Sequence, residues 1–247
     1  MNIYNVVCEY LAKGKSGAMA TIVRNIGATP QGMGAKMFIG EDGKIFGTVG
    51  GGCVEAEIWQ ESRRVLASKQ AKLLHYPLNG NSVEDEGLIC GGSVDILIEP
   101  VLKHYNEIYK NVGEFQKRAK KGLIITRFGI KGFSKGFHSI TGEFLGDISL
   151  DDIRHIIKNS IGEKNIKIYD DMIVEPVFGT SNLYIYGAGH LSQFVSKLAK
   201  MMDFYVVVMD DREGFANRER FPEADEIIVD DFNNISLYNN GDENGYV

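Results

Sequence analysis

The first part of the chain alternates short apolar runs with glycine-rich turns. Strand-like runs occur at residues 18–26, 35–40 and 44–49, with the sequences AMATIVRNI, AKMFIG and KIFGTV. The spacing then becomes helical over residues 53–70. There the apolar residues fall on one side and the charged residues on the other. These apolar residues are Val54, Ile58, Val65 and Leu66.

The middle of the chain repeats this mixture of strands and helices. A strand-like run, AKLLHYP, is followed by a polar loop and then by LICGGSVDILIEPV at residues 88–101, whose later part alternates like a strand. Further on, helical spacing at 102–121 and 150–162 flanks two strand-like runs. The phrase IVEPVF at 173–178 echoes LIEPV at 97–101, but it is too short to establish a repeat. It is interpreted as the last strand before a boundary near Gly179.

Residues 182–213 have a different pattern: strand, glycine turn, helix and strand within one short unit. The run YVVVM suits a parallel strand that is buried on both faces. The helical residues are Leu191, Phe194, Val195, Leu198 and Met202. The pattern predicts an α/β protein with an N-terminal α+β domain built on a mixed sheet (residues 1–179). A shortened, incomplete Rossmann-like domain follows at residues 180–247.

Charge and cysteine content narrow the function classes. Of the 33 acidic residues 12 lie in residues 180–247, against 5 of the 27 Lys and Arg, and no basic run exceeds KRAKK at 117–121. Nucleic acid is therefore not an expected partner. No apolar run is long enough to cross a bilayer and no leader pattern opens the chain, so we expect no membrane association and a cytoplasmic location. Three cysteines in 247 residues do not suggest a disulfide framework.

The glycine turn at residues 187–192, GAGHLS, carries the nucleotide-binding signal. Gly187 would make the tight turn, and Gly189 would let a pyrophosphate approach the helix N-terminus. Asp210 ends the next strand, where an acidic residue would hold a ribose hydroxyl, but Arg212 suits a 2′-phosphate, so NAD and NADP both stay open. His190 is either a ligand-facing proton carrier or an exposed helix-cap residue. The alternative for the whole turn is architecture without a nucleotide.

The stretch GGGCVEAE at residues 50–57 raises the second candidate site. The free main-chain amides of Gly51, Gly52 and Cys53 would point into the turn that precedes a helix, where an anion fits. Cys53 at the helix N-terminus would have a lowered pKa and would be a good nucleophile or soft-metal ligand. The alternative is a sharp turn with a small buried cysteine.

A second cysteine and glycine cluster strengthens the first. Cys90, Gly91 and Gly92 repeat the pairing of a thiol with consecutive glycines. Cys90 lies 37 positions after Cys53, and neither has a second cysteine or histidine close by in the sequence. Structural zinc sites favour closely spaced ligand pairs, so this spacing argues against one. We expect Cys53 and Cys90 to approach each other in space, because a soft metal often takes more than one sulfur ligand. Cys8 falls in the apolar pattern of the first helix and is interpreted as core.

Together, the motifs GAMATIVRNIGATPQGMGAKMFIGEDGKIFGTVGGGCVE, CGGSVDILIEP, YGAGHLS and VMDDRE resemble the xanthine dehydrogenase accessory protein family, also called XdhC/CoxI. The resemblance spans nearly the whole chain. It implies a maturation factor, a chaperone that binds molybdenum cofactor, protects it and hands it to a molybdenum hydroxylase such as xanthine dehydrogenase. It also ties sulfuration of the metal to that step, which leaves a cysteine desulfurase open as a further partner.

Site residues carried over from the family fall on two motifs. The first comprises Gly51, Gly52 and Cys53, and the second Cys90, Gly91 and Gly92. The cofactor's phosphate would suit the amides of Gly50 to Gly52, and its molybdenum would suit the thiols of Cys53 and Cys90. A chaperone needs no catalytic residue, and none is assigned.

Two other function classes stay open. One is an NAD(P)-dependent oxidoreductase acting on a small molecule, and the other is a cysteine-based sulfur carrier. A shortened Rossmann half would leave the strand LYIY at a sheet edge. We expect a longer natural chain, or an edge covered by IVEPVF or by a second protomer in a homodimer, together with weak or absent NAD binding. The residues NGYV would be at most the opening of a fourth strand.

Overall fold

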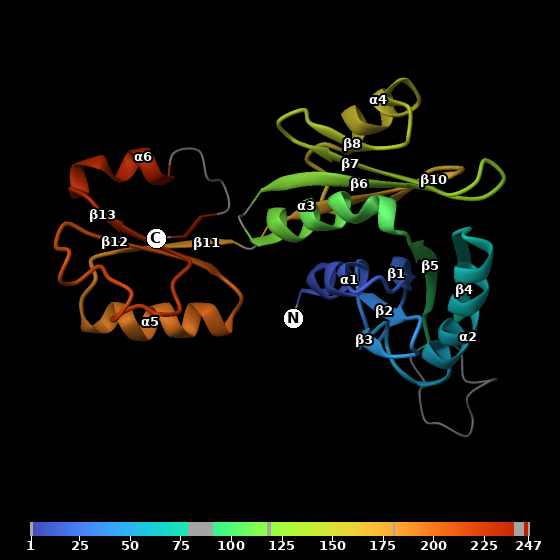
Figure 1. The fold of residues 1–247 in the computed structure, drawn as a ribbon, viewed down its shortest axis with the longest axis horizontal. Helices are drawn as coiled ribbons and strands as arrows, with labels where there is room; N and C mark the ends of the chain where they lie inside the picture. The colour runs from blue at the N-terminus through green and yellow to red at the C-terminus, as the bar shows by residue number, and fades with distance from the viewer. Residues whose placement is uncertain (1, 79–90, 118–119, 180, 240–244, 247) are drawn as a thin grey trace. The chain divides into compact units, whose positions relative to one another are not determined.

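The computed structural model describes residues 2–78, 91–117, 120–179, 181–239 and 245–246 (Figure 1). The chain forms two compact units. The N-terminal unit comprises residues 1–113 and 122–177, and the C-terminal unit comprises residues 114–121 and 178–247. Helix α3, Asn106–Lys117, contributes to both.

The N-terminal unit begins with α1, Ile3–Ala12, and a five-stranded sheet with the order β3-β2-β1-β5-β4, here called sheet A. All its strand pairs are antiparallel. The strands are β1 Gly17–Ile26, β2 Lys36–Gly40, β3 Ile45–Gly47, β4 Lys72–Pro77 and β5 Ser93–Val101. Helix α2, Gly52–Ser68, covers one face of the sheet and buries Ile58 and Val65 against it.

A second sheet of the same size, sheet B, has the order β8-β7-β6-β10-β9. Its strands are β6 Lys121–Arg127, β7 Ser134–Ser139, β8 Phe144–Gly146, β9 Lys167–Ile168 and β10 Met172–Phe178. Helix α4, Leu150–Ser160, packs Ile153 and Ile157 into its core. The expected α+β class of this domain is confirmed, and its strands are divided between two sheets. Two sheets form because the second half of this unit supplies a full set of strands of its own.

The two sheets are structural repeats. Each half runs helix, three antiparallel strands, helix and two strands, and the strand orders correspond element by element. Gly17 on β1 leaves room for the ring of Phe38, and Gly122 on β6 leaves room for Phe137 in the same way. The phrases LIEPV and IVEPVF occupy corresponding strands, β5 and β10. The echo that was too short in the sequence thus belongs to a repeated fold.

Two ion pairs join the repeats reciprocally, one buried and one partly exposed. Lys135 on β7 lies 2.5 Å from Glu99 on β5, with the two side chains 4% and 5% exposed. Lys36 on β2 lies 2.7 Å from Glu175 on β10. Each lysine also donates to a threonine of its own sheet, Thr126 or Thr21. An unpaired charge at these positions would be costly, so the pairs fix how the two sheets meet.

The C-terminal unit contains a three-stranded parallel sheet with the order β11-β12-β13. Its elements are β11 Asn182–Tyr186, α5 His190–Met201, β12 Tyr205–Asp210, β13 Glu226–Val229, the 3₁₀ helix η2 Phe232–Asn234 and α6 Ile235–Asn239. Val206 to Met209 are buried, as the apolar run predicted.

The free side of β11 is met by Tyr246. Tyr246 forms a parallel bridge with Leu183, and its amide donates to the Asn182 carbonyl at 2.8 Å. This is the place of a fourth Rossmann strand, as expected. The alternative in which IVEPVF covers this edge is wrong, because β10 pairs inside sheet B.

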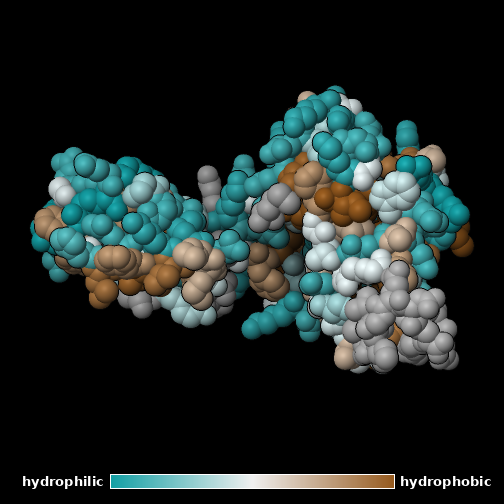
Figure 2. Space-filling model, turned by 90° about the horizontal axis from the view of Figure 1, so that it is seen from below, coloured by the Kyte–Doolittle hydropathy of each residue, from teal (hydrophilic) through white to brown (hydrophobic). Residues whose placement is uncertain are grey.

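Helix α5 packs on its sheet through small residues. Ser196 and Ala199 are buried, whereas Leu191, Phe194, Leu198 and Met201 are between 59% and 81% exposed. Figure 2 shows hydrophobic residues along one edge of the unit that holds α5. The helical spacing predicted the helix, but its bulky face points to solvent. Among the described helices, none is both long and apolar enough to cross a bilayer.

Candidate functional site

The turn between β3 and α2 requires glycine at consecutive positions. Gly50, Gly51 and Gly52 have φ values of 129°, 83° and 64°, a region that residues with a Cβ rarely adopt. Gly51 is the N-cap residue of α2, and a Cβ there would meet no atom within 4 Å. The space beside Gly51 is therefore open, and Cys53 follows in the first turn of the helix, half-buried.

A carboxylate from the same helix organises this turn. Glu55 Oε1 accepts hydrogen bonds from Thr48 Oγ1 at 2.6 Å, from the Val49 amide at 3.1 Å and from the Gly51 amide at 3.0 Å. Burial alone would raise the pKa of Glu55, but these hydrogen bonds outweigh it and hold the pKa below its ordinary value. The turn thus carries its own anion.

This geometry corrects the expected phosphate site. The amides of Gly50 and Gly51 were expected to suit the cofactor's phosphate, but both already donate to side chains of the turn. The Gly50 amide donates to Thr48 Oγ1 at 3.1 Å and the Gly51 amide donates to Glu55. A phosphate at the turn would meet the Glu55 carboxylate, and like charges repel. The sequence signal for this was a glutamate in the first turn after the glycines, a position from which acidic residues cap helix N-termini.

The corresponding turn of the second repeat shows what the fold itself needs. Between β8 and α4 the chain passes through Asp147, Ile148 and Ser149, with Ile148 buried as Val49 is. The same strand-to-helix connection is made there without a glycine run and without a cysteine. The fold thus makes the corresponding connection in the second repeat without the sequence of the Gly50–Cys53 turn.

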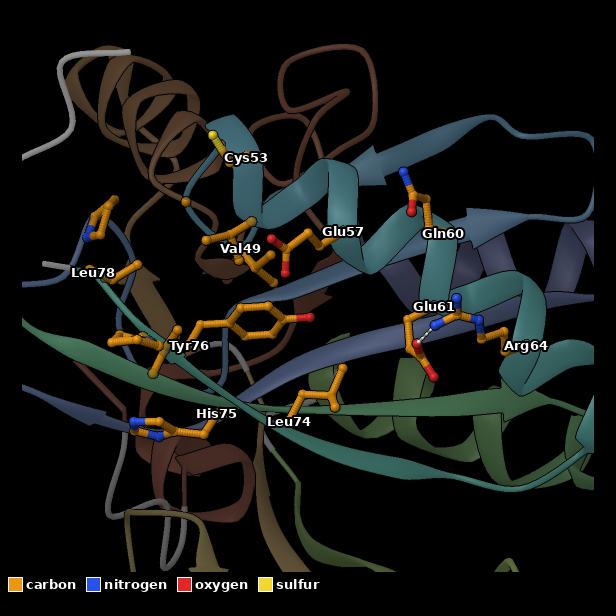
Figure 3. A pocket seen from close by; sticks show the side chains of 16 residues that line it. Val49, Cys53, Glu57, Gln60, Glu61, Arg64, Leu74, His75, Tyr76 and Leu78 are labelled. Carbon is orange, nitrogen blue, oxygen red and sulfur yellow. Dashed lines mark hydrogen bonds and ion pairs between the residues drawn. The ribbon is translucent and has the colours of Figure 1, made fainter. Parts of the chain in front are cut away.

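A pocket of about 560 Å³ opens beside this turn (Figure 3). One side is α2, which contributes Cys53, Glu57 and Gln60, and the other side is β4. The alternation of β4 places Leu74 and Tyr76 on the face toward α2, where they pack against the core of sheet A together with Leu78, the residue after the strand. The sequence analysis missed this wall. The alternating run LLHYPL was the signal that could have found it.

Most charges around the pocket are already paired. Glu61 accepts from Arg64 and Lys72, both at 2.8 Å, and His75 Nδ1 lies 2.6 Å from Asp95 Oδ1. Glu57 is different, because no cation of the described chain pairs with it. Within the same described part, no group of three or more His, Cys, Asp or Glu side chains is arranged to hold a metal ion.

Only Gly91 and Gly92 of the second cysteine and glycine cluster lie within the described residues. Cys90 falls outside the described residues, so its approach to Cys53 stays a prediction. Gly91 has a φ of 65° with open space around it. Gly92 is packed between backbones, because a Cβ there would lie 2.4 Å from the carbonyl oxygens of Ala28 and Ile26. Gly92 thus has a structural reason to be glycine. Cys8, expected in the core, is half-buried.

The glycine turn of the C-terminal unit is built around Asp210. Asp210 is fully buried, and its Oδ2 accepts from the Ala188 amide at 2.7 Å. Arg212 donates to both carboxylate oxygens, at 2.8 Å from Nε and 3.0 Å from Nη2, and its amide donates at 3.0 Å. The hydrogen bonds from Arg212, with the Ala188 amide, hold the pKa of Asp210 far below its usual range. A ribose hydroxyl would have to displace Arg212.

The other residues of that turn leave space. Gly187 has a φ of 96°, and neither it nor Gly189 has an atom within 4 Å of an added Cβ. Gly189 is the N-cap of α5, and His190 begins the helix with an exposed side chain. These residues have the geometry of a dinucleotide turn, and their role in binding stays a prediction.

Comparisons with known proteins match both units. Residues 10–77 match the XdhC and CoxI family model, and residues 183–244 match the XdhC Rossmann domain. The chain belongs to the XdhC and CoxI family. A solved structure described as a xanthine dehydrogenase, BH1974 of Bacillus halodurans, superposes with a TM-score of 0.73 at 26% identity. The superposition covers 96% of this chain and 70% of that one.

Two proteins of Escherichia coli are similar to parts of the chain. The uncharacterized protein YqeB of Escherichia coli is 35% identical over 98 residues, covering 40% of this chain and 18% of YqeB. The molybdenum cofactor insertion chaperone PaoD of E. coli is 29% identical over 149 residues, covering 55% of this chain and 46% of PaoD. The chain thus spans less than half the length of each of these relatives.

Proposed function

We propose that the protein binds molybdenum cofactor in the pocket beside Cys53 and delivers it to a molybdenum hydroxylase of the xanthine dehydrogenase type. The observation that carries the proposal is the pocket between α2 and β4, with a thiol and an extra glycine turn at its edge. The names of PaoD and of the B. halodurans structure support the choice of cofactor and client.

The residues present fit such a ligand. The pocket volume of about 560 Å³ lies within the range of roughly 300–1,000 Å³ typical of small-molecule sites. Its lining combines apolar side chains with polar and charged ones, and the Cys53 sulfur is a donor that soft metals favour. Cys53 would hold the metal end, and the α2 and β4 side chains would enclose the organic part. When bound, the cofactor supplies the metal centre that the client needs for hydroxylation.

The protein's own part is binding and protection. The open space beside Gly51 lets a ligand approach the main chain, and the apolar β4 wall excludes water from one side of it. Delivery needs no catalytic residue in this chain. We place the protein in the cytoplasm with its client. A cysteine desulfurase and a second copy of the chain stay as predicted partners.

The oxidoreductase alternative has less support, because the carboxylate expected to hold a ribose is engaged by Arg212. The sulfur-carrier alternative uses the same Cys53. Detection of a persulfide on Cys53 by mass spectrometry, without bound cofactor, would favour it.

The test is retention of the cofactor by the purified protein. Cofactor released from a donor enzyme is incubated with the protein, and co-elution and activation of a cofactor-free hydroxylase are measured. We expect Cys53→Ala to lose most of the co-eluting cofactor and of the activation, with Cys8→Ala as the matched control. A Cys53→Ala protein that retains and delivers cofactor like the parent would refute the proposal.

A further inference from the structure

The pocket beside α2 has an apolar wall and an acidic side. The wall is formed by Leu74 and Tyr76 of β4, Leu78 directly after it, and Val49. Figure 3 shows the Glu57 side chain directed from α2 toward the Tyr76 ring. A flat, aromatic ligand would bury its faces against such a wall, and a carboxylate at its rim would accept hydrogen bonds from its edge.

The charges decide which end of a ligand this pocket takes. Glu61 is neutralised by Arg64 and Lys72, which leaves Glu57 as the carboxylate without a cation among the described residues. Glu55 adds a second negative charge at the glycine turn. An anionic group such as a phosphate is disfavoured here, whereas a group with two N–H donors on one edge is favoured.

The protonation state of the Tyr76 hydroxyl is consistent with a ligand bound through hydrogen bonds at Glu57. Burial, with the nearby charges of Glu57 and Glu61, raises the pKa of Tyr76 to about 12. The hydroxyl therefore stays protonated at neutral pH and available as a hydrogen-bond donor beside Glu57.

We infer that this pocket takes the pterin ring of the cofactor, with Glu57 accepting from its 2-amino group and ring N3–H while the Tyr76 and Leu74 side chains pack against the ring. The inference rests on the proposed function and names the part of the cofactor that the pocket recognises. The amino group and the ring N–H lie side by side, like two donors of a guanidinium, and a carboxylate can accept both at once. The phosphate would then lie outside the pocket.

The test uses two small probes that lack metal, dithiolene and phosphate. Pterin (2-amino-4-oxopteridine) presents both donors, whereas lumazine (2,4-dioxopteridine) replaces the amino group with a carbonyl oxygen, which Glu57 would repel. Binding is followed by quenching of probe fluorescence at pH 6.5. We expect the parent protein to bind pterin at least about tenfold more tightly than lumazine.

Variants complete the experiment. Glu57→Gln should weaken pterin binding roughly tenfold to a hundredfold, the effect of losing hydrogen bonds to a charged group, and should narrow the preference over lumazine. Glu9→Gln, an exposed carboxylate on α1, should change neither. Equal affinities for the two probes, or a Glu57→Gln protein with the parent's preference, would overturn the inference.

The cofactor assay separates this inference from the proposed function. If the parent retains and delivers whole cofactor but does not distinguish pterin from lumazine, the pterin placement is wrong while the chaperone function stands. If it prefers pterin through Glu57 but neither retains nor delivers whole cofactor, the pocket assignment stands while the chaperone function fails.

Discussion

Glu55 Oε1 accepts a hydrogen bond of 3.0 Å from the amide of Gly51. The contact joins the first turn of α2 to the glycine turn that precedes it, and it places a negative charge where the sequence suggested an anion-binding site. The turn is thus closed by its own side chain. Its stability should depend on the ionisation of that side chain.

The first prediction concerns Glu55→Gln. At pH 7 it should lower the free energy of unfolding by about 1–2 kcal/mol, because charged hydrogen bonds become neutral ones. Since the pKa of Glu55 is below its ordinary 4.5 in the folded protein, the carboxylate stabilises the fold above that pH. This stabilisation is lost as the pH falls through the lowered pKa. Urea unfolding across this range should show the difference from the parent shrinking toward acid. A difference that does not change with pH would contradict this.

The second prediction compares the two ion pairs between the sheets. Lys135→Met should lower the free energy of unfolding by about 3–5 kcal/mol, because it leaves Glu99 buried without a partner. Lys36→Met is the matched control and should cost less, because Lys36 and Glu175 are 9% and 20% exposed. Replacing both Lys135 and Glu99 with apolar residues should recover part of the loss. Equal losses for the two single variants would argue against this account.

The third prediction separates the two glycines of the second motif. Gly92→Ala should cost about 3 kcal/mol, the upper end for overpacking, because the new Cβ would clash with two backbone carbonyl oxygens. Gly91→Ala meets only the penalty of a left-handed conformation, about 1 kcal/mol. Chemical denaturation measures both. If the order were reversed, Gly92 would not have the packing role assigned here.

The sequence predicted local structure well where one periodicity dominated. The run YVVVM became the buried strand β12, and the strand, glycine turn and helix around Gly187 formed as expected. Pairing between distant segments was harder. The two repeats share few sequence features, such as the glycines that face Phe38 and Phe137. No local pattern in the sequence therefore indicated that the unit holds two sheets rather than one.

For the site, the sequence pattern located the Gly50–Cys53 turn but did not predict which side chains accept hydrogen bonds from its amides. The Gly50 amide donates a hydrogen bond to Thr48 and the Gly51 amide donates one to Glu55. The geometry of both hydrogen bonds depends on the turn itself. The wall of Leu74 and Tyr76 comes from β4 and meets α2 only after the sheet has formed. Periodicity also predicts that α5 has an apolar face, but not that Ser196 and Ala199 would be the residues facing the sheet.

The fourth prediction follows from α5. Phe194→Ser and Leu198→Ser should change the free energy of unfolding of the monomer by less than about 0.5 kcal/mol, because both side chains are largely exposed. Ala199→Leu should cost about 1–3 kcal/mol through overpacking against the sheet. Measurements at several protein concentrations also test the predicted homodimer. If a second copy covers the face, the parent alone should gain stability with concentration.

The last prediction concerns nucleotide binding by the C-terminal unit. Both oxygens of Asp210 are engaged by Arg212 and the Ala188 amide, so the parent should bind NAD weakly or not at all. Arg212→Ala removes the side-chain donors and exposes a carboxylate at the end of β12, where a ribose hydroxyl would be held in a dinucleotide fold. The variant should therefore bind NAD more tightly than the parent, whereas Lys197→Ala on α5 should not. Titration calorimetry with NAD and NADP decides between the two roles of Arg212. Tight NADP binding by the parent that is lost in Arg212→Ala would mean that Arg212 meets a 2′-phosphate, and would promote the oxidoreductase alternative over the chaperone.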